Sequence, residues 1–104
     1  MLREDLLNKA AEITKGARQE HYGTPEDNFK RIAEYWQTYL RQTQHPDIVL
    51  AAHDVAIMMV LMKTARLAAD CFHDDSWLDI AGYAACGSEC AEKYADDKYE
   101  RQGV

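Results

Sequence analysis

The sequence predicts an all-α protein, a four-helix antiparallel bundle that forms a single domain over residues 1–104. Apolar residues recur at helical spacing in four separate segments. The chain contains only two prolines and five glycines, and no segment shows the alternation typical of a strand. Neither a repeat nor a linker divides it, and a chain of this length can bury one small core.

The first two helices are predicted over residues 2–20 and from Thr24 to residues 41–44. Gly23 separates them, because glycine readily adopts the left-handed conformation that ends a helix. Thr24 can cap the second helix, Pro25 fits its first turn, and Asp27 follows three residues after the cap. The apolar stripe of this helix consists of Phe29, Ile32, Ala33, Trp36, Tyr39 and Leu40.

Pro46 is expected to open a third helix that runs to about Asp70. Thirteen of the fifteen residues from 48 to 62 are apolar, so this helix should be buried on nearly every side. A monomer of this size has few neighbours to cover it. We therefore predict a homo-oligomer, a dimer or tetramer, that contacts through residues 48–62.

The fourth helix is predicted over residues 76–98, with Asp74 or Asp75 as its cap. Residues 81–88 are almost all small and include two glycines. Glycine inside a helix costs about 1 kcal/mol relative to alanine. Such a stretch is therefore expected where another backbone approaches closely, and we expect it to pack on the third helix.

Two aspartates at the start of the fourth helix are the clearest candidate site. Asp75 and Asp79 are four residues apart and therefore share a helix face. Two carboxylates at this spacing could hold Mg²⁺, which prefers oxygen ligands. Alternatively, Asp75 caps the helix and Asp79 forms a buried ion pair.

Two basic residues near the end of the third helix are candidate partners for these acids or for a phosphate. Lys63 and Arg66 are three residues apart on one face, and Arg66 can bind a carboxylate or phosphate through two hydrogen bonds. The alternatives are a solvated helix end, whose charges offset the C-terminal dipole, and a structural Arg66–Asp79 salt bridge.

Polar residues also occur at two other informative places. His53 and Asp54 interrupt the apolar run, and we expect a satisfied core or interface pair ahead of metal ligation or catalysis. The segment 18–29 concentrates polar side chains around a tight turn between two helices. Loops between rigid elements commonly carry function.

Composition narrows the classes of partner and location. Twelve Lys and Arg against eighteen Asp and Glu give a net charge of −6, which argues against nucleic acid as the main partner. The three cysteines form no paired framework, so we expect reduced thiols and a cytoplasmic protein. The first residues lack the apolar stretch of a signal peptide, and no apolar run is long enough to span a membrane.

Two stretches of the sequence form a distinctive combination. The first reads R-x-x-H-Y-G-T-P-x-x-N-F over residues 18–29. The second contains D-V-A-x-M-M-x-x-x-K-x-x-R over 54–66 and D-D-S-x-x-D-x-A-G-Y-A over 74–84. Together they resemble a family of small, uncharacterised phage and prophage proteins. The second stretch is also similar to a phage nucleotide-modification-associated domain and, more distantly, to the all-α, MazG-like nucleoside triphosphate pyrophosphohydrolases.

The MazG-like resemblance implies a helical, oligomeric, Mg²⁺-dependent enzyme that splits a nucleoside triphosphate into monophosphate and pyrophosphate. Those enzymes hold the metal with two acidic clusters, E-E-x-x-E and E-E-x-x-D. Asp75 and Asp79 can stand for the second cluster, as metal ligands and catalytic residues, with serine in place of one acid. Glu26 and Asp27 are the best counterpart of the first, with Lys30 where its third acid would be.

Two readings from different classes follow. In the first, a nucleotide binds between the third and fourth helices of a protein in the host cytoplasm. Asp75, Asp79 and Glu26 then hold Mg²⁺, and the nucleotide contacts are Lys63, Arg66, Tyr22, Tyr83 and Asn28. In the second, the protein is a non-catalytic phage accessory that binds a host protein or sequesters a nucleotide signal, and Asp79 is structural. A plain oligomerisation module is a third possibility.

Overall fold

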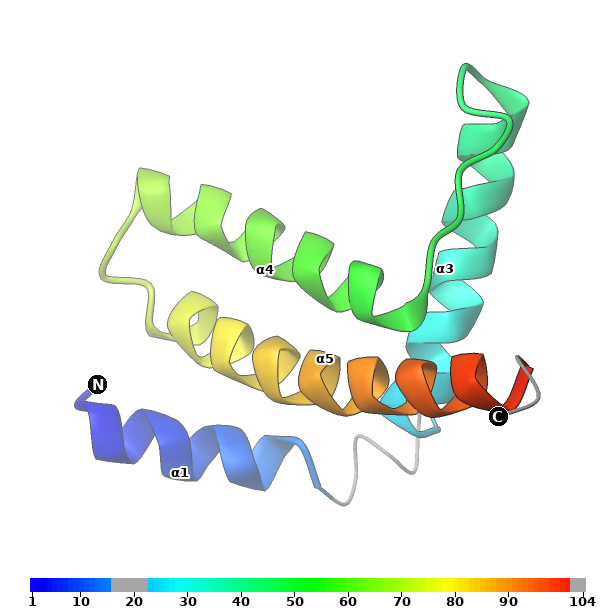
Figure 1. Cartoon of the computed structure of the whole chain (residues 1–104). Helices are drawn as coiled ribbons and strands as arrows, with labels where there is room; N and C mark the ends of the chain where they lie inside the picture. The colour runs from blue at the N-terminus through cyan, green and yellow to red at the C-terminus, as the bar shows by residue number, and fades with distance from the viewer. Residues whose placement is uncertain (16–22, 102–104) are drawn as a thin grey trace.

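The structure is a computed structural model that describes residues 1–15 and 23–101, with side chains described to residue 96. Within these residues it has four α-helices and no strand, which confirms the all-α prediction. The helices are α1 (Arg3–Ile13), α3 (Pro25–Gln42), α4 (Ala52–Ala69) and α5 (Asp74–Arg101) (Figure 1).

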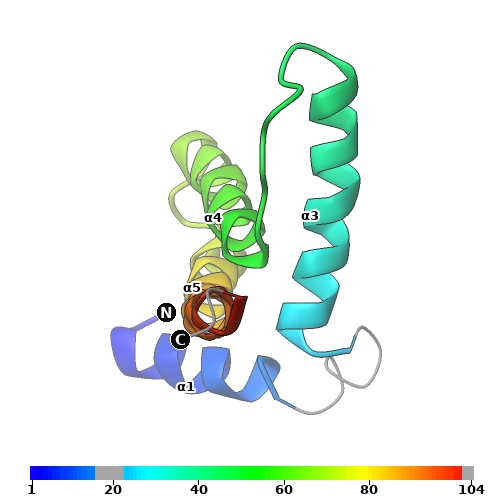
Figure 2. The same ribbon diagram turned by 45° about the vertical axis from the view of Figure 1, so that its right-hand side comes forward.

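The helix α5 is the centre of the arrangement. It packs antiparallel against α4, and α1 lies along another side of α5 (Figures 1 and 2). The α1–α5 pair is parallel, because Met1 contacts Asp74 and Ile13 lies near Gly82. The second half of α3 extends away from the α4–α5 pair. The predicted antiparallel arrangement therefore describes α4 and α5, whereas α1 and α3 depart from it.

The buried core lies where α3, α4 and α5 meet. Its buried members are Phe29, Ala33, Val55, Ala56 and Cys90. The expected close approach of the small-residue stretch to α4 is confirmed at Gly87. A Cβ atom built there would lie only 2.8 Å from the Cβ of Ala56.

The start of α3 follows the prediction closely, whereas α1 ends earlier than expected. Gly23 has a φ of +79°, and the Asp27 N–H donates to the Thr24 hydroxyl at 3.2 Å. Helix α1 is predicted to reach residue 20 but ends at Ile13, and residues 16–20 of that prediction lie outside the described residues. Just beyond the helix, the Thr14 hydroxyl donates to the carbonyls of Ala10 and Ala11.

The starts of α4 and α5 correct two predictions. Helix α4 begins at Ala52 rather than Pro46, because side chains of α3 hold the preceding segment. The Leu50 N–H donates to Gln37 Oε1 at 2.9 Å, and Arg41 Nε donates to the Ile48 carbonyl at 2.9 Å.

Helix α5 begins at Asp74, so the two predicted caps, Asp74 and Asp75, lie inside its first turn. Their negative charges there interact favourably with the helix dipole. The ring of His73, just before the helix, lies 2.8 Å from the Ser76 hydroxyl.

Candidate functional site

An ion pair joins α4 to α5 at the centre of the candidate site. Lys63 Nζ lies 2.9 Å from Asp79 Oδ2, and the two side chains are 11% and 25% exposed. An Arg66–Asp79 salt bridge was one of the alternatives for Arg66, and Lys63 takes that place instead. Three residues advance a helix by about 300°, so Arg66 is turned about 60° from Lys63, and it is exposed.

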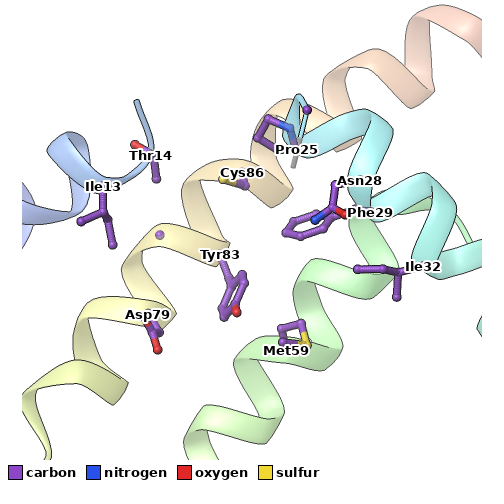
Figure 3. Close-up of a pocket in the computed structure, with 12 residues that line it drawn as sticks. Ile13, Thr14, Pro25, Asn28, Phe29, Ile32, Met59, Asp79, Tyr83 and Cys86 are labelled. Carbon is purple, nitrogen blue, oxygen red and sulfur yellow. The ribbon is translucent and has the colours of Figure 1, made fainter. Parts of the chain in front are cut away.

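Asp79 also forms part of the wall of an apolar cavity of about 170 Å³. Tyr83 of α5, Phe29 of α3 and Met59 of α4 point into the space between their helices (Figure 3). The Phe29 and Tyr83 ring centroids are 6.1 Å apart at an interplanar angle of 44°. Among the residues that the structure describes, the lining consists of Ile13, Thr14, Gly23, Pro25, Asn28, Phe29, Ile32, Met59, Asp79, Gly82, Tyr83 and Cys86.

A second cavity, of about 490 Å³, adjoins the first where α1, α3 and α5 come together. The two cavities share Thr14, Pro25 and Cys86. The second is polar, and its other described lining residues are Lys15, Thr24, Glu26, Ala85, Glu89 and Lys93. Lys93 Nζ lies 3.7 Å from Glu26 Oε1. Sequence reasoning missed Lys15 and Lys93, because only the folded chain brings them together.

The predicted site residues fall into separate groups. Asn28, Asp79 and Tyr83 line the apolar cavity, and Glu26 lines the polar cavity. Asp75 is exposed in the first turn of α5 and lines neither. Tyr22 lies outside the described residues.

The side chains near the cavities do not fit a magnesium cage. Among the described residues, no three His, Cys, Asp or Glu side chains gather closely enough to hold a metal ion. The nearest Asp79 oxygen contacts Lys63, and Glu26 contacts Lys93. Magnesium bound in proteins needs several oxygen ligands in near-octahedral geometry. We therefore derive no catalytic step through a metal from this arrangement.

The His53–Asp54 pair at the start of α4 is only partly satisfied. Asp54 Oδ2 accepts the Ala51 N–H at 2.8 Å, and Asp54 Oδ1 lies 3.6 Å from His53 Nε2. The His53 ring packs on Tyr94, with centroids 5.1 Å apart. Its buried Nδ1 has no hydrogen-bond partner among the described residues. We expected the polar groups of both residues to have partners. This is confirmed for Asp54, whereas His53 Nδ1 has no hydrogen-bond partner among the described residues.

Within the part of the chain that the structure describes, no helix combines the length and apolarity needed to cross a membrane.

Comparison with known proteins identifies the family. Residues 5–91 match a domain of unknown function, DUF6378. The "Gene 55 protein" of Mycobacterium phage D29 is 42% identical over 83 residues, which cover 80% of this chain and 51% of that protein. The "Gene 55 protein" of Mycobacterium phage L5 is 40% identical over 79 residues, which cover 76% of this chain and 47% of that protein. No solved structure matches.

This chain therefore spans about half the length of the phage relatives it matches. The resemblance to phage proteins is confirmed, and the more distant likeness to MazG-like enzymes stays a prediction. The match over residues 5–91 covers most of the sequence, and the chain belongs to the DUF6378 family.

Proposed function

We propose that this phage-related protein binds a nucleotide across the two adjoining cavities. The observation that carries the proposal is the junction of an apolar, aromatic cavity with a polar cavity that contains two lysines. A nucleotide has the same division, since a flat heteroaromatic base is joined through a sugar to charged phosphates. Neither cavity alone selects that class of ligand.

The apolar cavity fits the base. An apolar cavity of about 150 Å³ can hold one benzene-sized ring, so a cavity of about 170 Å³ suits a single ring system. Phe29 and Tyr83 provide aromatic contacts for a flat ring. Asn28 and Asp79 add a few polar groups, which in an apolar site fix orientation and specificity.

The polar cavity fits the phosphates. Lys15 and Lys93 line it, and lysine binds phosphate as a compact point charge. Lys63 is engaged by Asp79, and Arg66 is exposed outside both cavities. We therefore assign the phosphates to Lys15 and Lys93 in place of Lys63 and Arg66. Glu26 and Glu89 also line this cavity and balance the two lysines in charge, and a phosphate would compete with Glu26 for Lys93.

Hydrolysis and the need for Mg²⁺ stay predictions of the MazG-like resemblance. The described acids near the cavities do not gather into a three-ligand group. Sequestration of a nucleotide signal, the non-catalytic alternative, would use the same two cavities. The binding experiment therefore includes Mg²⁺ as a variable and a measurement of released pyrophosphate.

The test is a thermal-shift screen of nucleoside triphosphates with and without Mg²⁺. The variants are Asn28→Leu, in the apolar cavity, and Asn8→Leu, an exposed position on α1 with the same change. Binding to the folded state raises the melting temperature by mass action. We expect a shift in wild type and Asn8→Leu that is lost in Asn28→Leu. The absence of a shift with every nucleotide would contradict the proposal.

A further inference from the structure

Asp79 lies at the end of the apolar cavity that is remote from the polar cavity. The residues that the two cavities share include Pro25 and Cys86, and Figure 3 shows both of them away from Asp79. Asp79 and Cys86 are seven residues apart on α5. This spacing places them on nearly the same face of the helix, with about 10.5 Å between them along its axis. A nucleotide whose phosphates occupy the polar cavity therefore reaches Asp79 with the part of its base farthest from the phosphates.

The size of the apolar cavity favours a pyrimidine base. A pyrimidine is one six-membered ring, whereas a purine is two fused rings. An apolar cavity of about 150 Å³ holds one benzene molecule, and this cavity measures about 170 Å³. Phe29, which forms part of its wall, belongs to the buried core, so the cavity cannot widen there without disturbing close packing. A single ring therefore fits it better than two.

The orientation of a bound pyrimidine decides which of its groups faces Asp79. The sugar is attached at N1, and C4 lies directly across the ring from N1. With the phosphates in the polar cavity, the substituent on C4 therefore points to the Asp79 end of the apolar cavity. That substituent is an amino group in cytosine and a carbonyl oxygen in uracil and thymine.

Asp79 presents a hydrogen-bond acceptor to this position. It is the charged side chain among the described residues that line the cavity. An ionised carboxylate accepts hydrogen bonds and donates none, and it is a suitable partner for the amino group of cytosine. Lys63, which could donate to a carbonyl oxygen, contacts Asp79 Oδ2 and is not among the described lining residues. Asn28 and Tyr83 each carry a donor and an acceptor, so they suit either kind of pyrimidine.

We propose, on the basis of the nucleotide site proposed above, that the cavity selects cytosine nucleotides and that Asp79 sets this preference. The C4 amino group of cytosine donates to the Asp79 carboxylate. A uracil or thymine in the same place sets a carbonyl oxygen against the carboxylate, and two acceptors without a hydrogen between them are left unsatisfied. A purine is disfavoured by its second ring.

The first test is a calorimetric titration of wild type with the 5′-triphosphates of cytidine, uridine and adenosine and of the cytidine analogue that lacks the C4 amino group. The deoxyribose forms are titrated in the same way. We expect the cytidine triphosphate to bind at least about tenfold more tightly than each of the others. Equal binding of all four would overturn the cytosine preference and leave the nucleotide site standing. Failure of all four to bind would overturn both.

The second test asks whether Asp79 sets the preference. Asparagine carries both a donor and an acceptor, so Asp79→Asn should bind the cytidine and uridine triphosphates with similar affinity. Both affinities are measured on the same variant, so a lower stability of Asp79→Asn affects them equally. Asp75→Asn is the matched control, because it makes the same change one turn earlier, at an exposed position that lines neither cavity, and it should keep the preference of wild type. A preference that persists in Asp79→Asn, or that disappears in Asp75→Asn, would overturn the role of Asp79.

Discussion

Lys63 and Asp79 join α4 to α5 through a contact of 2.9 Å at the wall of the apolar cavity. Both side chains are mostly buried, at 11% and 25% exposed. Asp79 therefore has two roles that can be separated by experiment. It neutralises a lysine that would otherwise be a buried charge, and it presents a carboxylate to whatever occupies the cavity.

Loss of the Asp79 charge should destabilise the fold. Asp79→Asn is expected to lower the free energy of unfolding by about 1–3 kcal/mol, because the Lys63 ammonium keeps its charge and loses its carboxylate partner. Urea denaturation measures this change. The Lys63→Met/Asp79→Leu double variant should regain most of the loss, since neither charge is left in the helix interface.

Glu26→Gln is the control for this prediction. It breaks a longer ion pair, of 3.7 Å, whose lysine partner Lys93 is 62% exposed. Exposed pairs of this kind contribute less than about 1 kcal/mol. If both variants lower the free energy of unfolding by the same amount, the buried Lys63–Asp79 pair contributes no more stability than the exposed Glu26–Lys93 pair, and the prediction is contradicted.

The two glycines of α5 should respond differently to the same substitution. Gly87→Ala places a methyl group 2.8 Å from the Ala56 Cβ, so α4 and α5 must separate, at a cost of about 1–3 kcal/mol. Gly82→Ala meets Ile13 and Thr14 at an ordinary 3.8 Å. It should be neutral or stabilising by up to about 1 kcal/mol, because alanine favours a helix. Calorimetric melting of both variants tests this, and similar melting temperatures would contradict it.

The stability of the protein should fall in alkaline solution because of Cys90. Burial, with a smaller effect from Glu26, raises the pKa of the Cys90 thiol from 9.0 to about 11. Between these values the unfolded thiol loses its proton while the folded thiol keeps it. The free energy of unfolding from this group therefore decreases as pH rises through that range. Below about pH 9 the contribution is constant.

The measurement is the urea midpoint as a function of pH in wild type and in Cys90→Ala. Cys90→Ala also removes packing contacts and so lowers stability at every pH. The comparison is therefore between the slopes of the urea midpoint against pH, and not between the midpoints themselves. We expect a smaller alkaline slope in Cys90→Ala. Identical slopes would mean that other groups cause the alkaline loss.

The features that the sequence predicted well depend on near neighbours in the chain. The Thr24 cap needs only Asp27, and the left-handed Gly23 needs only its own lack of a side chain. The close approach at Gly87 could be predicted because a run of small residues has few other uses in a helix. All three follow from composition and spacing over a few positions.

The features that it predicted poorly depend on distant residues. Gln37 holds the Leu50 N–H across thirteen positions, and this contact delays the start of α4 beyond Pro46. The choice of Lys63 over Arg66 depends on the rotation of α4 against α5. The polar cavity needs the end of α1, the start of α3 and the middle of α5 at once. No local pattern specifies such a meeting.

The most direct test of the two-cavity site is a calorimetric titration that separates the base from the phosphates. A nucleoside and its 5′-triphosphate are titrated into wild type and into the Lys15→Gln/Lys93→Gln double variant. In wild type the triphosphate should bind at least about tenfold more tightly than the nucleoside. In the double variant the triphosphate should bind no more tightly than the nucleoside, whose own affinity stays unchanged. A triphosphate that binds the double variant as it binds wild type, or that does not bind wild type at all, would contradict the proposed site.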